Sequence, residues 1–319
     1  MELVKLTNSM RRCFAKCKRA YMYNYVQLRR SAESAECLRF GTMVHSALEA
    51  WWLAAPEKRL APAIAALDGD KECDPFDKAK ASALITGYDA MWGAQTYRTV
   101  SAETGFEAPL MNPETGANSK TYMLAGKIDA IAEDADGKML IIEHKTTSDS
   151  VDADSDYWKK LSIDGQVSGY YLGASALGID ARDCVYDVIH KPGLKPYKAT
   201  PADKVKLKKD GTPYAGTRLS DETPEEYGAR VMEDIQANPA KYFARRSVMR
   251  TKSDLTDYLY DMWAVGRDIA DAERLGRYQR NPDACAMMVR CEYFPVCSGV
   301  ASIDDDALYR TAAKTNEEL

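Results

Sequence analysis

Two carboxylates and a lysine stand beside one short apolar segment of this 319-residue chain. Asp129 is followed fourteen residues later by Glu143, and Lys145 comes two residues after that glutamate. The residues just before Glu143, Met139–Ile142, are all apolar, which favours a buried strand. Burying carboxylates is costly unless a cation compensates, and a hard divalent ion binds through oxygen. The sequence therefore predicts a magnesium or manganese site.

A β-hairpin is the element that would position these side chains. Asp136-Gly137 is typical of a hairpin turn, and an apolar strand is expected on each side of it. On the second strand Glu143 and Lys145 are two residues apart and share a face, whereas His144 points the other way. The hairpin can therefore bring Asp129 beside Glu143.

Three cysteines near the end of the sequence suggest a second metal site. Cys285, Cys291 and Cys297 recur at an equal spacing of six residues. Closely spaced thiols indicate a soft-metal site, and such a site requires a fourth ligand. Zinc sites usually contain a cysteine pair roughly two to four residues apart, which these three cysteines lack. Unligated, buried thiols are the alternative interpretation.

Four motifs, which occur in the family's order along the chain, resemble the PD-(D/E)xK nuclease superfamily. Gly41–Glu49, which contains His45, resembles its upstream metal-binding helix. Asp129, the hairpin and Glu143-x-Lys145 resemble its catalytic signature, and Gln166–Tyr170 resembles its downstream glutamine-tyrosine helix. Cys17–Tyr21 with the three later cysteines resembles the split four-cysteine motif of its RecB-type branch. The likeness is closest to nucleases of that branch encoded by phages and prophages.

This resemblance implies a fold and a set of site residues. The fold would be α/β, with a restriction-endonuclease-like core in which helices flank a mixed central sheet, an N-terminal helical region and a C-terminal cysteine-rich segment. The implied ligands of Mg²⁺ or Mn²⁺ are His45, Asp129, Glu143 and the backbone carbonyl of His144. Lys145 would position the attacking water and offset charge on the phosphate during phosphodiester hydrolysis. Gln166 and Tyr170 would complete the catalytic site.

The four-cysteine motif implies an iron–sulfur cofactor. A [4Fe-4S] cluster would be held by Cys17, Cys285, Cys291 and Cys297. Structural zinc is the alternative metal, and Cys13 is the alternative fourth ligand. Either metal would tie an N-terminal helix to the C-terminal segment, so its role would be to staple the fold and not to transfer electrons.

The function implied by the resemblance is a metal-dependent DNA nuclease. Its substrate would be single-stranded or duplex DNA ends, which an exonuclease would degrade in recombination or repair, and a recombinase or helicase would be a suitable partner. The alternatives are a structure-specific endonuclease and a non-catalytic nucleic-acid-binding or assembly module with the same fold. The intact Asp129, Glu143 and Lys145 favour an enzyme, because a binding module has no reason to bury them.

One elaborated nuclease domain, residues 1–319, is expected, because no internal repeat or low-complexity linker divides the chain. Its expected parts are a helical N-terminal part (1–100), the catalytic core (101–190), a long basic loop (191–222), a helical and cluster-binding part (223–300) and an acidic tail (301–319).

The net charge of −5 is unusual for a DNA-binding protein, which typically has a basic surplus. A local basic path suffices for an enzyme that grips a few phosphates. Lys204, Lys206, Lys208 and Lys209 in the long loop are candidates for one wall of that path, and residues 245–252 form another basic group. The sequence shows no signal peptide and no apolar stretch near the roughly twenty residues of a membrane span. It predicts a protein of the cytoplasm, or of the host cytoplasm if phage-encoded.

Overall fold

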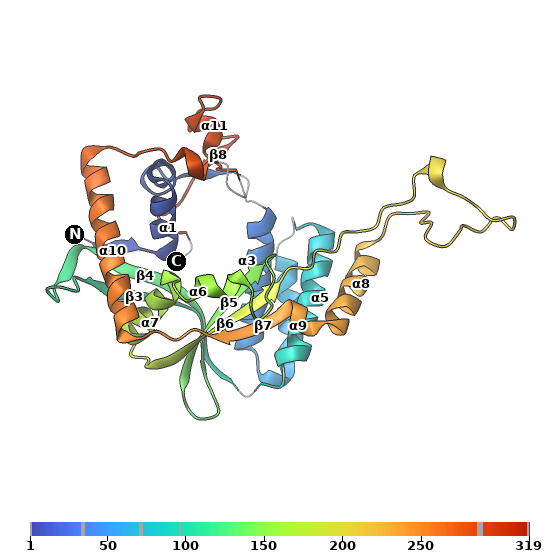
Figure 1. Cartoon of the computed structure of the whole chain (residues 1–319), viewed down its shortest axis with the longest axis horizontal. Coiled ribbons are helices and arrows are strands. Elements are labelled where there is room, and N and C mark those ends of the chain that lie inside the picture. The colour runs from blue at the N-terminus through green and yellow to red at the C-terminus, as the bar shows by residue number, and fades with distance from the viewer. Residues whose placement is uncertain (1, 33–35, 70–72, 96, 286–289, 318) are drawn as a thin grey trace.

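A mixed six-stranded sheet lies at the centre of the structure, a computed structural model that describes residues 2–32, 36–69, 73–95, 97–285, 290–317 and 319 (Figure 1). The strand order is β1-β4-β5-β6-β7, and β3 pairs with β4. A separate pair joins β2 to β8. The strands are β1 (Val4–Leu6), β2 (Arg29–Ser31), β3 (Arg98–Met111), β4 (Asn118–Glu133), β5 (Met139–Thr147), β6 (Ala181–His190), β7 (Phe243–Ser247) and β8 (Tyr309–Thr311).

Helices cover both faces of this sheet, which confirms the predicted α/β fold. Helices α7 and α10 lie on one face, and α3, α5 and α8 lie on the other (Figure 1). The helices are α1 (Asn8–Lys16), α2 (Lys18–Tyr21), a π-helical turn (Met22–Val26), α3 (Glu36–Leu53), α4 (Leu60–Ala66), α5 (Pro75–Trp92), α6 (Asp156–Leu161), α7 (Gly165–Ala176), α8 (Pro224–Ala237), α9 (Pro239–Tyr242), α10 (Lys252–Leu275) and α11 (Phe294–Cys297). Short 3₁₀ turns span Pro56–Lys58, Leu67–Gly69, Ala202–Lys204 and Pro282–Ala284. Across the described ranges, none of the helices combines the length and apolarity that crossing a membrane requires.

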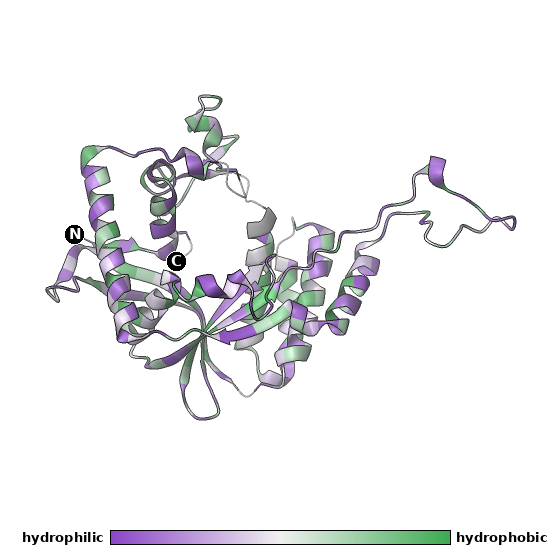
Figure 2. Cartoon of the chain, viewed as in Figure 1, coloured by the Kyte–Doolittle hydropathy of each residue, from purple (hydrophilic) through white to green (hydrophobic). Residues whose placement is uncertain are grey.

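Strand β5 is buried on both faces because successive side chains enter different cores. Ile141 packs into the core beneath α7 and α10, whereas Leu140 and Ile142 pack into the core beneath α3, α5 and α8. Figure 2 shows hydrophobic and hydrophilic segments side by side on the central strands of the sheet. The side chains continue to alternate in the polar end of β5. The Glu143 side chain therefore lies on the face covered by α7, and the His144 side chain lies on the face covered by α3.

Strand β4 carries a break along one edge, and this break positions the site. Its other edge pairs with β3 along nearly its whole length. On the broken edge, residues 122–124 pair with β1 in parallel, while residues 130–133 pair with β5 in the predicted hairpin. The hairpin turn contains Gly137, whose φ of +79° suits glycine. Between the two pairings the sheet opens at residues 125–129.

The terminal parts of the chain differ from the all-helical region and the acidic tail that were expected. The first described residues form β1, and the first helix is interrupted at Cys17, whose backbone is extended (φ −163°, ψ 115°). The first three residues of the basic group 245–252 belong to strand β7, which pairs with β6 at the edge of the sheet. The expected tail folds back, because β8 pairs with β2 and Glu317 forms ion pairs with Arg30 and Arg310.

Residues 191–222 form a long arm that projects away from the body beside α5 and α8 (Figure 1). Its base is anchored, since Arg230 donates to the buried Glu222, which also accepts from the backbone of Tyr197 at 2.7 Å. The two sides of the arm are held farther out by a hydrogen bond from Thr200 N to Arg218 O. The loop predicted from composition is therefore an extended arm, which we call the basic arm.

Candidate active site

Asp129 lies at the opening in the edge of β4. The β4–β5 ladder ends with the pair Ala130–Ile142, and beyond it the Asp129 carboxylate accepts a hydrogen bond from the backbone N–H of His144 at 2.8 Å. The Asp129 carboxylate thus accepts the hydrogen bond that a backbone carbonyl of β4 would accept if the ladder continued. This bond holds the aspartate beside Glu143 and Lys145, as the hairpin predicted.

Glu143 and Lys145 project together toward helix α7. Lys145 Nζ forms an ion pair with Glu143 Oε1 and also donates to Gln166 Oε1 at 3.1 Å. Gln166 in turn donates to the hydroxyl of the buried Tyr170. The side chain of Asp164 caps the first turn of α7 by accepting from Gln166 N at 2.9 Å, which fixes the start of the helix. The structure therefore brings the predicted glutamine and tyrosine to the predicted lysine.

Burial perturbs the ionisation of all three motif residues. It raises the pKa of Glu143 to about 7, with a further rise from the nearby Asp129 and an opposing effect of Lys145. Burial likewise raises the pKa of Asp129. For Lys145, burial acts to lower the pKa, but the two carboxylates outweigh it and the net change is upward. The two acids therefore resist ionisation unless a further positive charge enters the site.

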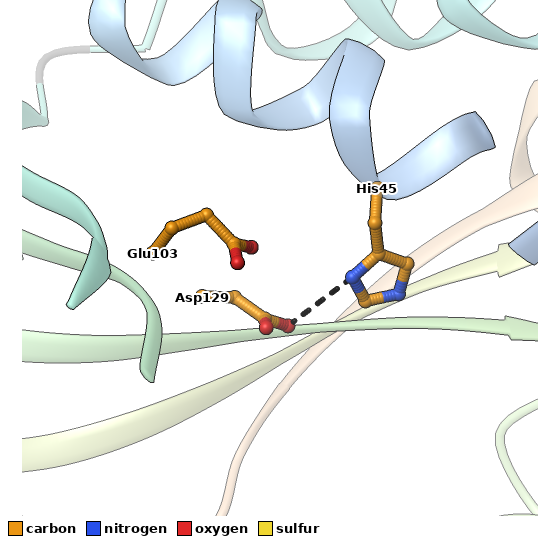
Figure 3. A group of neighbouring side chains, drawn as sticks. All are labelled: His45, Glu103 and Asp129. Atoms are coloured by element: carbon orange, nitrogen blue, oxygen red, sulfur yellow. Dashed lines mark ion pairs between the residues drawn. The ribbon is translucent and has the colours of Figure 1, made fainter. Parts of the chain in front are cut away.

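His45 on α3 approaches Asp129 from the other side. Its Nδ1 lies 3.8 Å from Asp129 Oδ2 (Figure 3). Burial lowers the pKa of His45 to about 4, so the imidazole is neutral near pH 7 and its nitrogen lone pair is free to bind a metal. The Gly41–Glu49 motif is thus on the predicted helix and reaches the predicted carboxylate.

Glu103 is a site residue that the sequence interpretation missed. Its carboxylate, Asp129 and His45 each offer a ligand atom within 4.8 Å of the others (Figure 3). Glu103 lies on β3, where the neighbouring pairs Ala102–Ala130 and Thr104–Ile128 place it across from Asp129. In the sequence Glu103 is a single glutamate outside the four motifs, which by itself does not distinguish a site residue from a surface one.

The His144 side chain lies on the opposite face, as the alternation predicted. Its Nδ1 is 3.3 Å from the carboxylate of Asp187, which is completely buried on β6. Asp187 also accepts from Arg245 at 2.9 Å and from the hydroxyl of Tyr88. Although burial favours the neutral acid, Arg245 holds the pKa of Asp187 well below its ordinary value. This network braces β5 behind the site, and only the backbone of His144 faces the opening.

The predicted site residues share a cavity of about 220 Å³, whose lining includes His45, Asp129, Glu143, Lys145, Gln166 and Tyr170. Glu143 is 1% exposed, and its Oε2 receives no hydrogen bond of normal geometry from any residue that the structure describes. A buried oxygen without a partner is costly. Carboxylates and a neutral imidazole around such an oxygen fit a divalent cation such as Mg²⁺ or Mn²⁺.

The four predicted cysteine ligands surround a second cavity. Cys17, Cys285, Cys291 and Cys297 all line it, and its volume is about 160 Å³. The break after α1 turns Cys17 toward the C-terminal segment, to which it is fixed by a hydrogen bond from Arg19 N to Gln279 O. Cys13 is not among the lining residues and packs against the core beneath α7 and α10.

The spacing of these thiols limits what the second cavity can hold. Burial raises the pKa of Cys291 and Cys297, so thiolates there need a cation. Within the described part of the chain, no three cysteine sulfurs lie within 4.8 Å of one another. A single zinc, with bonds of about 2.3 Å, would hold its sulfurs closer than that. The four residues share one cavity in which thiolates would need a bound cation.

Comparisons with known proteins agree with this geometry. Residues 5–298 match the PD-(D/E)XK nuclease superfamily, so the match spans nearly the whole chain. No curated protein matches it significantly. A solved structure titled "Crystal structure of SSO0001" is 17% identical, covers 61% of this chain and 73% of that chain, and has a TM-score of 0.22, which supports no argument about function. On the family match, the chain belongs to the PD-(D/E)XK nuclease superfamily.

Proposed function

We propose that this protein is a metal-dependent DNA exonuclease, which hydrolyses phosphodiester bonds at DNA ends in recombination or repair. One observation carries the nuclease assignment: Asp129, Glu143 and Lys145 meet at an opening in the sheet, with a buried carboxylate oxygen that lacks a partner among the described residues. The preference for ends and the role in recombination or repair rest on the resemblance of the motifs to RecB-type nucleases.

Four groups of this chain would hold Mg²⁺ or Mn²⁺. They are the carboxylates of Asp129 and Glu143, the imidazole of His45, and the backbone carbonyl of His144. When bound, the cation would supply Lewis-acid activation of the phosphodiester and of water. The hydrogen bond from His144 N fixes the Asp129 carboxylate through Oδ2, the oxygen that also lies 3.8 Å from His45 Nδ1. This preorganisation reduces the entropy that binding would otherwise cost.

Lys145 would act on the phosphate and on the attacking water. Its raised pKa keeps the ammonium charged at neutral pH, so it can stabilise negative charge that develops on the phosphate oxygens. The ion pair with Glu143 and the hydrogen bond to Gln166 restrict the ammonium to the cavity. Gln166 has the supporting role of orienting Lys145, and Tyr170 orients Gln166 from the core.

A [4Fe-4S] cluster held by Cys17, Cys285, Cys291 and Cys297 is the proposed structural cofactor. It is supported by the position of all four cysteines on the lining of one cavity of about 160 Å³. The cluster would join segments more than 260 residues apart in sequence, since Cys17 also lies against Gln279. Zinc remains the alternative, and elemental analysis of protein prepared without oxygen separates the two.

The basic arm would bind DNA away from the scissile phosphate. Residues 191–222 contain eight basic and four acidic residues, a surplus of four in a chain whose net charge is −5. The arm lysines, Lys204, Lys206, Lys208 and Lys209, are all exposed. None of them lines the cavity, and the arm projects away from the body (Figure 1). The arm lysines would therefore contact DNA phosphates at a distance from the active site, and not form a wall beside it. Phosphates are the natural partner of such a surface.

The decisive experiment compares linear and covalently closed circular DNA with Mg²⁺, with Mn²⁺ and with a chelator. The exonuclease proposal predicts that linear DNA is degraded, that circular DNA persists, and that the chelator stops the reaction. Cleavage of circles at the rate of linear DNA would instead establish an endonuclease. Binding of DNA without cleavage under any metal condition would leave the non-catalytic module as the function.

A further inference from the structure

Glu103 adopts a backbone conformation that a glutamate rarely adopts. Its φ is +49°, in the left-handed region that favours glycine, although it lies within the long strand β3. Such a conformation is unfavourable for a residue with a side chain, and it persists where the surrounding structure or function requires it. Glycine would fit the backbone better, so the presence of glutamate points to a use for the carboxylate.

The charges around Glu103 are unbalanced. The carboxylates of Glu103 and Glu143 approach Asp129 from two neighbouring strands. Lys127 pairs with Glu103 and Lys145 pairs with Glu143, so in these pairs neither ammonium is assigned to Asp129. The partnerless Oε2 of Glu143 independently indicates that something else belongs in the cavity.

We propose that Glu103 is a ligand of the divalent cation, which it binds together with His45 and Asp129. This inference rests on the proposed metal-dependent function and adds a ligand that the sequence motifs do not contain. The three ligand atoms lie within 4.8 Å of one another and come from three elements, β3, α3 and β4 (Figure 3). Two carboxylates and a neutral imidazole form a donor set that suits Mn²⁺.

The simpler role for Glu103 is its ion pair with Lys127, which is partly exposed. Exposed ion pairs contribute little, so this pair does not account for an unfavourable backbone conformation. The ion pair also predicts a different outcome from metal ligation. If pairing is the whole role, removing Lys127 and removing Glu103 should have the same effect. If Glu103 binds metal, the two changes should have different effects on metal affinity.

The test measures Mn²⁺ binding to the full-length protein without DNA, by calorimetry and by electron paramagnetic resonance. Glu103→Gln should weaken binding by about tenfold or more, or abolish one bound equivalent, because even indirect partners of a metal contribute tenfold or more to affinity. Glu103→Gly should weaken it similarly while its melting temperature equals or exceeds that of the metal-free parent, because the backbone is relieved. Lys127→Met should retain the affinity. Glu107→Gln, a matched change on the same strand at an exposed pair with Lys5, should also retain it.

The outcomes separate this inference from the proposed function. If the parent protein binds no Mn²⁺, the metal-dependent function itself fails. If the parent binds Mn²⁺, Asp129→Asn loses it and Glu103→Gln binds as tightly as the parent, only the role of Glu103 is refuted. Equal losses in Glu103→Gln and Lys127→Met would assign Glu103 to the ion pair alone. Should Glu103→Gln fold poorly, Glu103→Gly provides the same comparison on a less strained backbone.

Discussion

Replacing Glu143 by glutamine should stabilise the metal-free protein while it abolishes activity. The side chain keeps its shape, but the buried site no longer has to accommodate a charge that it is poorly equipped to hold. The raised pKa of Glu143, about 7 against an ordinary value of 4.5, already includes the favourable pairing with Lys145. Since each pKa unit corresponds to about 1.4 kcal/mol, ionised Glu143 costs the metal-free fold about 3 kcal/mol.

The sign of the pH dependence follows from the same difference. Between pH 4.5 and about 7 the folded protein holds a proton on Glu143 that the unfolded chain has released. The free energy of unfolding therefore falls as pH rises through this window and is constant above it, as far as this group is concerned. Glu143→Gln removes this slope. The variant should match the parent at low pH and exceed it by about 3 kcal/mol at about pH 9.

Urea unfolding of the parent and of Glu143→Gln, with a chelator present, measures this difference directly. Saturating Mn²⁺ should then stabilise the parent by several kcal/mol, roughly 3 at a hundredfold excess over the dissociation constant, and the variant by less. Glu107→Gln is the control for a glutamate in an exposed ion pair, and it should change neither the slope nor the response to metal. A metal-free variant that is less stable than the parent at high pH would refute the reasoning.

Three further predictions concern the remaining parts of the protein. Lys145→Met should lower the rate of DNA cleavage on the order of a thousandfold while DNA is still bound, which single-turnover kinetics can measure. Cys17→Ser should lose bound iron and lower the melting temperature, whereas Cys13→Ser should keep both, as metal analysis of protein prepared without oxygen will show. Replacing the four arm lysines by alanine should flatten the salt dependence of DNA binding by up to about four units of slope and leave turnover on saturating DNA nearly unchanged.

The residues of the motifs could be predicted because their geometry is local. A two-residue period and a hairpin turn suffice to place Glu143 and Lys145 on one face beside Asp129, and the structure has this arrangement. Gln166 and Tyr170 are one helical turn apart, so they share a face wherever α7 docks. The family match covers residues 5–298, so it includes the segments between the motifs as well as the motifs themselves.

What could not be predicted depends on contacts between distant segments. Glu103 becomes a site residue only through the register of β3 against β4 and through its positive φ, neither of which leaves a pattern in the sequence. Arg245 belongs to a basic group that suggested a solvated or DNA-binding surface. The structure instead buries its side chain against Asp187 and Trp92, because β7 adds to the edge of β6. Charge alone did not reveal that this arginine has an internal partner.

The contact between Cys17 and the segment that follows α10 has a consequence for synthesis. Arg19 N donates to Gln279 O, and the Asn281 side chain donates to Lys16 O, so the N-terminal helices acquire these partners only after about 260 further residues. At a ribosomal speed of roughly 5–20 residues per second, the wait is on the order of tens of seconds. During it the apolar face of α1 at Met10 and Phe14 lacks α10 as cover. A nascent chain of this protein should therefore bind chaperones through the apolar face of α1, and crosslinking on stalled ribosomes can follow when that contact ends.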